Sequence, residues 1–359
     1  MLIIMWIMQA IILIMGAMLV LATCFSATRT FVLPRSAADP LAGILFRSIR
    51  YIFVFIARRQ TSYEGLDRVM AFYAPVSLLL LLPYWLTLVL IGFMGIFWAT
   101  GISSWADAFT VSGSSLLTLG FARGDTAVHT ALSFIEATIG LILVALLIAY
   151  LPTMYNAFSQ RERAITLLEV RAGSPPSAEE MIARLHRIGR FDHLHELWET
   201  WETWFAELSE SHTSLAALVF FRSPQPQHSW LTASGTILDA AALVLSSIEA
   251  PWDAQAALCL RAGYLALRHI ADFFRVPYNP HPSHPTDPIS ISREEFEAVL
   301  DRLAGQGVPL KSDRDAMWQD FAGWRVNYDT VLLALSALIM APYAPWSSDR
   351  SLRQSPVKS

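Results

Sequence analysis

The sequence predicts an all-α membrane protein with three transmembrane helices, a re-entrant helix between the last two, and a cytosolic all-helical domain. Only 16% of its 359 residues are charged, whereas soluble proteins carry about 25%. Three apolar runs are long enough to cross a bilayer core of about 30 Å. Elsewhere apolar residues recur at helical spacing, and no alternating strand pattern occurs.

The three apolar runs are residues 1–25, 70–99 and 131–151. The first two contain no charged side chain, and the third contains only Glu136. A cleaved signal peptide is the rival interpretation of residues 1–25, but it requires a basic start and an apolar core of about 7–15 residues. This stretch has neither feature, so we expect it to remain as a span. Pro152 is expected to end the third span.

Arginines are distributed unevenly between these runs. Residues 26–69 contain seven arginines, whereas residues 100–130 contain only Arg123. Basic residues collect on the cytoplasmic side of membrane proteins. The sequence therefore predicts a multi-pass protein of the cell membrane, with a bacterial inner membrane as the expected location. Its N-terminus is placed outside, residues 26–69 inside, the loop 100–130 outside and residues 152–359 inside.

Residues 41–57 allow two interpretations. They are apolar apart from Arg47, Ser48 and Arg50, so they could form a fourth span. Two arginines in the middle of a span are costly, and a fourth span would also break the arginine distribution. We therefore expect an amphipathic helix lying at the cytoplasmic face, with its arginines toward the lipid headgroups.

Residues 152–359 are expected to form a cytosolic helical domain. Residues 277–288 contain five prolines and are predicted to form an exposed linker. Trp198, Trp201 and Trp204 share one helix face, which is typical of a core or a subunit interface. Ser177–Glu180 and Ser292–Glu295 have the pattern of capping boxes at helix starts, and Gly305 is a plausible helix end. The tail after Pro345 is expected to be disordered.

Several functional classes receive no support from the sequence. A net charge of −4 gives no basis for nucleic-acid binding, and no nucleophile–base arrangement indicates an enzyme. The two cysteines, Cys24 and Cys259, lie too far apart in the chain to suggest a disulfide framework or a zinc site. We expect no cofactor and no bound metal. A regulator of the cytosolic domain is expected, but its chemistry is not readable.

The loop between the second and third apolar runs has a distinctive order of residues. Residues 104–117 are too few and too polar to span and are expected to form a short helix. Thr118-Leu119-Gly120-Phe121 follows, and Gly124-Asp125 comes shortly after. This order, flanked by two spans, resembles the pore loop of the two-span potassium channel family. The resemblance covers residues 70–155, so residues 70–151 are interpreted as a pore domain.

The resemblance implies a homotetramer in a lipid bilayer that conducts a cation, with potassium as the expected ion. Rings of backbone carbonyls can replace the hydration shell of a cation. The resemblance implies that the carbonyls of Thr118, Leu119, Gly120 and Phe121, with the Thr118 hydroxyl, line a selectivity filter. Glycine is expected where such a backbone needs an unusual φ.

The outer mouth departs from the family pattern. The family has glycine directly after the aromatic residue and then aspartate, but Ala122-Arg123 precede Gly124-Asp125 here. Either Ala122 takes the place of the second glycine or two residues are inserted. Arg123 would oppose cations unless it pairs with Asp125. Selectivity between potassium and sodium therefore stays open, and a non-conducting membrane-anchored sensor or scaffold is the alternative function.

Two residues of the third span are candidates for modulating the pore. Glu136 is expected either to form a hydrogen bond behind the filter or raise the local cation density, or else to be a partly hydrated carboxylate near the interface. Gly140 is expected to be either a hinge of the pore-lining helix or a point of close helix packing.

Overall fold

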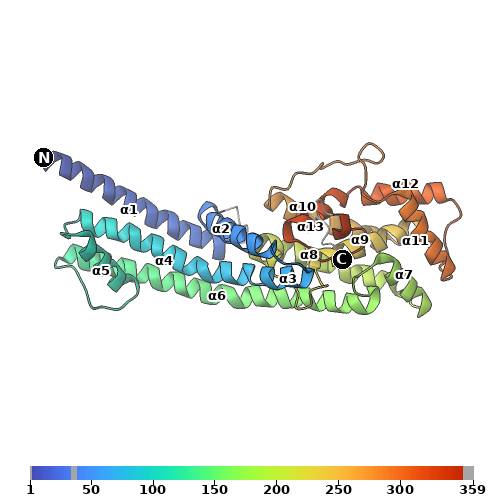
Figure 1. The fold of residues 1–359 in the computed structure, drawn as a ribbon, viewed down its shortest axis with the longest axis horizontal. Helices are drawn as coiled ribbons and strands as arrows, with labels where there is room; N and C mark the ends of the chain where they lie inside the picture. Colours follow the sequence, from blue (N-terminus) through green and yellow to red (C-terminus); the bar gives the residue numbers. More distant parts are fainter. Residues whose placement is uncertain (1, 34–38, 351–359) are drawn as a thin grey trace. The chain divides into compact units, whose positions relative to one another are not determined.

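The computed structural model describes residues 2–33 and 39–350, and the ordered elements in these ranges are helices (Figure 1). One isolated bridge, between Ile248 and Leu310, is the exception. The chain divides into two compact units. The first unit comprises Met1–Phe55 and Phe72–Tyr155, and the second comprises Ile56–Ala71 and Asn156–Ser359. The all-α prediction is confirmed for the described residues. One of the seven arginines of residues 26–69, Arg35, lies outside the described residues.

The first unit is built from α1 (Leu2–Phe31), most of α2 (Pro40–Ala57), α4 (Tyr73–Ala99), α5 (Trp105–Leu116) and the first part of α6 (Ala127–Ala172). Helices α1 and α4 pack along each other. Gly16 and Gly92 make this approach possible, because a Cβ atom on Gly16 would lie 2.5 Å from the Gly92 carbonyl oxygen. Small residues at helix contacts are typical of membrane packing.

Five helical stretches of the described residues are long and apolar enough to cross a membrane. They are Ile3–Phe31, Pro40–Ala57, Tyr63–Ala99, Ala127–Ala172 and Trp230–Ser247. This number indicates a multi-pass membrane protein. The last of the five is wholly buried inside the second unit, whereas α1 exposes most of its large apolar side chains.

Helix α6 does not end where the sequence analysis placed the end of the third span. It continues through Pro152 to Ala172, over 46 residues. A proline inside a helix removes one backbone hydrogen bond, yet α6 is continuous through Pro152. Met154 is buried in the turn after Pro152, and Ile165 and Leu168 join the core of the second unit.

The second unit surrounds α9 (Trp230–Ser247), whose residues are all buried. Helices α7 (Ala178–Arg187), α10 (Ala254–Phe273), α12 (Arg314–Arg325) and α13 (Asp329–Ile339) contact α9. The unit is completed by α3 (Tyr63–Ala71), α8 (Leu194–Ser214), α11 (Arg293–Gly305) and the short 3₁₀ helices η1 (Phe191–His193), η2 (Ala216–Phe220) and η3 (Ser348–Arg350).

Most local predictions for the second unit are confirmed. The tryptophan stripe of α8 is buried in the core, residues 277–288 contain no helix, and α11 begins with the full capping box and ends at Gly305. Ser177 precedes α7, but its side chain accepts no capping bond. The expected disorder after Pro345 is wrong for residues 346–350, where Ser348 is buried; residues 351–359 lie outside the described residues.

Candidate functional site: residues 104–140

The short helix predicted for residues 104–117 is α5, and its start is well defined. The Ser104 hydroxyl accepts a hydrogen bond from the Asp107 amide at 3.0 Å. Trp105, its first residue, stacks on Trp98 near the end of α4, with ring centroids 5.0 Å apart. This cap and this stack fix the helix next to α4, so the chain leaves α5 at a defined point.

Ser114, in the last turn of α5, organises the residues that follow. The amides of Leu119 and Gly120 donate to its carbonyl oxygen, at 2.9 and 3.3 Å. The amide of Ala122 donates to its hydroxyl oxygen at 3.0 Å. Three N–H groups of the segment are therefore directed at one buried serine.

The directions of these three N–H groups determine the directions of three carbonyl groups, because the peptide bond is planar and trans. In each peptide unit the N–H and the C=O point in opposite directions. The carbonyls of Thr118, Leu119 and Phe121 therefore point away from α5, toward the side where residues 117–121 are exposed. Gly120 has a φ of +74°, a region that favours glycine, and Thr118 has a φ of +54°.

Residues 122–125 include Ala122 at the position where the family pattern has a glycine, and the backbone of this alanine is not strained. Among residues 117–125, positive φ occurs only at Thr118 and Gly120, so Ala122 needs no glycine conformation. Gly124 covers the His129 ring, since a Cβ atom on Gly124 would lie 2.4 Å from the His129 Cβ. Arg123 and Asp125 are exposed, and no ion pair joins them within the described residues.

The structure places Glu136 of α6 against α5. Its carboxyl group is fully buried, and its Oε1 accepts a hydrogen bond from the Ser112 hydroxyl of α5 at 2.5 Å. The same hydroxyl lies 3.2 Å from the Leu90 carbonyl of α4. Glu136 therefore joins α6 to α5 at the level where α5 contacts α4.

Gly140 lies one turn further along α6, against the end of α5. A Cβ atom at this position would lie 2.6 Å from the Leu116 carbonyl oxygen. The glycine thus permits a close contact between α6 and the last residue of α5. Its role as a hinge stays a prediction.

One feature near the segment escaped the sequence analysis. His129 Nδ1, Ser133 Oγ and Glu136 Oε2 are buried and have no hydrogen-bond partner among the described residues. Their spacing of four and three residues places them on one face of α6. We call these three residues the polar stripe. The pattern was present in the sequence, but only the burial of the atoms distinguishes it from an ordinary hydrated helix face.

The described residues contain no cluster of three or more histidine, cysteine or acidic side chains that could hold a metal. Comparison with known protein families, curated proteins and solved structures finds no match to this chain.

Proposed function

We propose that four copies of the chain form a cation channel, with residues 118–121 of each copy facing one central axis. The observation that carries this proposal is the direction of three amides to Ser114, which turns the carbonyls of Thr118, Leu119 and Phe121 outward. A single chain offers these oxygens from one side only. Four chains would surround an ion with carbonyl rings that replace its water.

The proposed channel has three spans, α1, α4 and α6, with the N-terminus outside the cell and the second unit in the cytoplasm. The buried position of α9 supports its exclusion from the membrane. Helix α2 carries Arg47 exposed on its surface, which supports a place at the cytoplasmic interface with this arginine near lipid headgroups, whereas Arg50 is half-buried.

Potassium is the proposed permeant ion, and Arg123 sets a limit on the rate. Four unpaired arginines around the mouth would repel cations, and this repulsion is screened by salt over about 10 Å at 0.1 M. We therefore expect the conductance to rise with ionic strength more steeply than ion concentration alone requires.

The proposal is tested by ion flux into liposomes that contain the purified full-length protein. We expect potassium flux from a tetramer, and loss of the flux in Gly120→Ala, because alanine is strained at a φ of +74°. Gly43→Ala is the matched control, since no atom lies within 4 Å of a Cβ at that position of α2. A protein that is not tetrameric, or flux that is unchanged in Gly120→Ala, would favour the sensor or scaffold function.

A further inference from the structure

The second unit contains two segments that run directly into helices of the first unit. Helix α3 ends at Ala71, and α4 begins two residues later at Tyr73. Helix α6 enters the second unit after Tyr155. Within the second unit both segments contact the same short stretch, residues 216–222, which comprises η2 and the two residues after it. We call residues 216–222 the clamp segment.

Arg161 joins α6 to the clamp segment. Its guanidinium group is fully buried and donates to the carbonyl oxygens of Leu218 at 2.9 Å and Phe221 at 2.7 Å. Nη1 also lies 3.3 Å from Nε2 of the buried His212, and Glu162 neutralises the charge at 2.8 Å. Two backbone carbonyls of the clamp segment thus depend on one side chain of α6.

Arg222, the last residue of the clamp segment, joins it to α3. Nη1 donates to the Tyr63 hydroxyl at 2.9 Å and to the Asp67 carboxylate at 2.6 Å. Both members of the Arg222–Asp67 pair are about 90% buried. Burial raises the pKa of Asp67, and Arg222 acts against that shift. The other nitrogen, Nη2, donates to the carbonyls of Ile339 and Met340 at the end of α13.

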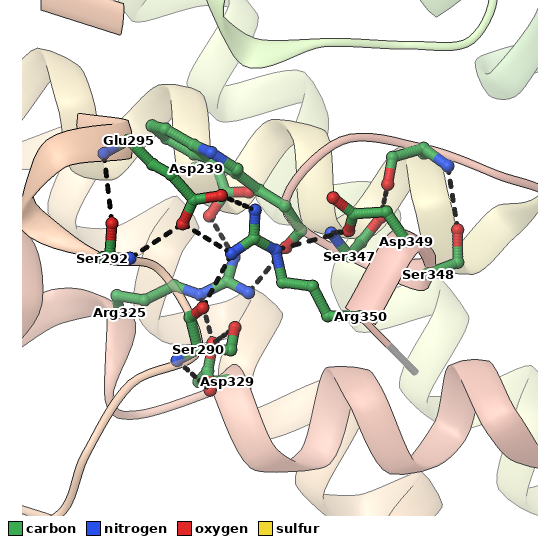
Figure 2. Close-up of polar contacts among 12 residues, drawn as sticks. Asp239, Ser290, Ser292, Glu295, Arg325, Asp329, Ser347, Ser348, Asp349 and Arg350 are labelled. Atoms are coloured by element: carbon green, nitrogen blue, oxygen red, sulfur yellow. Dashed lines mark hydrogen bonds and ion pairs between the residues drawn. The ribbon is translucent and has the colours of Figure 1, made fainter. Parts of the chain in front are cut away.

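The contact with Met340 links the clamp segment to the C-terminal residues 341–350. Met340 ends α13 in a left-handed conformation, and the chain then returns to the core. Figure 2 shows how it is held there. Arg325 donates to the Trp346 carbonyl at 2.6 Å, and Arg350 binds the Glu295 carboxylate and the Ser290 carbonyl. Arg350 also lowers the pKa of Glu295.

These contacts make the clamp segment a stiff connection. Arginine presents its donors in a planar fork, so each bond fixes direction as well as distance. The Arg161 guanidinium is fully buried and the Arg222 side chain is about 90% buried, so water has limited access to their partners. A displacement of α3 relative to the start of the second-unit part of α6 would break bonds of Arg222, of Arg161, or of both.

We infer that the clamp segment couples α3 to α6, so that a change in the second unit reaches the helices of the first unit through both segments together. Arg161 and Arg222 act as positioning residues for the pore, without contact to the ion. The effect on flux rests on the proposed channel function, whereas the mechanical connection does not.

Arg222→Gln tests the inference with two separate measurements. The first is amide hydrogen exchange of residues 63–71 in the full chain. We expect exchange to accelerate by at least about fivefold, in the range of typical coupling between sites. The second is flux in liposomes, where the rate should change by a similar factor while the potassium-to-sodium ratio stays unchanged.

Arg302→Gln is the matched control, because it removes an arginine–carboxylate pair with Glu179 on the surface of the same unit. It should change neither measurement. Arg222→Lys keeps the charge near Asp67 but loses the fork, and we expect it to restore part of the wild-type exchange. Asp67→Asn is a second variant that weakens the contact between α3 and the clamp segment, and it leaves Arg161 and Arg222 in place.

Unchanged exchange of residues 63–71 in both Arg222→Gln and Asp67→Asn would overturn the connection. Accelerated exchange with unchanged flux would overturn the coupling to the pore while leaving the connection intact. If the wild-type protein conducts no ions at all, the channel proposal fails, and the exchange result still decides whether the clamp segment holds α3.

Discussion

Helices α1 and α9 are both apolar enough to cross a membrane, yet they lie in opposite surroundings. Helix α1 exposes most of its large side chains, including Trp6, Ile14 and Met18. Helix α9 is enclosed by α7, α10, α12 and α13, and every one of its residues is buried. Hydropathy and length therefore identify an apolar helix, but burial within the chain distinguishes a core helix from a lipid-facing one.

Buried polar groups occur in both units, in two arrangements. In the second unit, Arg325 pairs with Asp239 at 2.5 Å and Asp329 at 2.7 Å, with each side chain in the core (Figure 2). Burial alone would lower the pKa of Arg325, but the two carboxylates raise it above its ordinary value. In the first unit, the polar stripe has buried atoms without protein partners. Buried side-chain atoms without a partner also occur among the described residues of the second unit, Trp198 Nε1 and Ser336 Oγ among them, so this feature is not confined to the first unit.

Cysteine labelling tests the contrast between α1 and α9 most strongly, since the result is all or none. In a background lacking Cys24 and Cys259, Ser103→Cys should react with a membrane-impermeant maleimide on intact cells. Thr286→Cys should react only after permeabilisation, because α9 is placed in the core and leaves the linker inside.

Labelling of both Ser103→Cys and Thr286→Cys on intact cells would show that α9 crosses the membrane. Absence of labelling at Ser103→Cys on intact cells, with labelling of Thr286→Cys, would show either that α2 is a fourth span or that the three-span orientation is reversed, and a cysteine exposed near the N-terminus, Ile3→Cys, would distinguish the two. Either result would contradict the proposed layout.

Replacing Arg325 is expected to have the largest effect on stability. Arg325→Leu leaves Asp239 and Asp329 buried without a counter-charge, which costs about 3–5 kcal/mol. Chemical unfolding followed by tryptophan fluorescence measures the change. Arg302→Leu, at an exposed pair, should cost at most about 1 kcal/mol. Equal losses in the two variants would contradict the difference between core and surface pairs.

Acid should destabilise the second unit through His212. Burial and the charge of Arg161 lower the pKa of His212 well below 6.5, so the folded state keeps the ring neutral while the unfolded chain takes up a proton below that pH. The stability is therefore complete above pH 6.5 and falls by about 1.4 kcal/mol per pH unit below it. Unfolding between pH 7.5 and 5 measures this slope, and His212→Gln should flatten it. A slope that persists in the variant would assign it to other groups.

Gly140→Ala should have a smaller, local effect. The added methyl group would lie 2.6 Å from the Leu116 carbonyl oxygen. Such overpacking lowers the free energy of unfolding by about 1–3 kcal/mol. We expect reduced flux, because the end of α5 must move. Gly113→Ala in α5 is the control, since its nearest neighbour would lie at 3.9 Å. Normal flux in both variants would show that the contact between Gly140 and Leu116 does not position residues 117–121.

The sequence was sufficient for much of the fold, because apolar periodicity and caps act over a few residues. The short helix after Ser104 and the capping box at Ser292 are examples. The sequence did not predict that α6 continues through Pro152 or that residues 346–350 are ordered. In the second case, the contacts of Trp346 and Arg350 come from residues far away in the chain.

The sequence singled out residues 118–121 as the candidate site, but it did not predict their geometry. The order of Thr118 to Phe121 between two apolar runs located the segment. The role of Ser114 required the turn that brings three amides back to it. The contacts of the clamp segment could not be predicted from the sequence. Arg222 and Asp67 are 155 positions apart, and no local pattern relates two such residues.

The most direct test of the channel proposal is an electron cryo-microscopy structure of the full chain in lipid nanodiscs with potassium. We expect four copies around one axis, with the carbonyls of Thr118, Leu119 and Phe121 facing it and ion density between them. A structure in which these carbonyls face lipid or bulk water, away from any symmetry axis, would contradict the channel proposal.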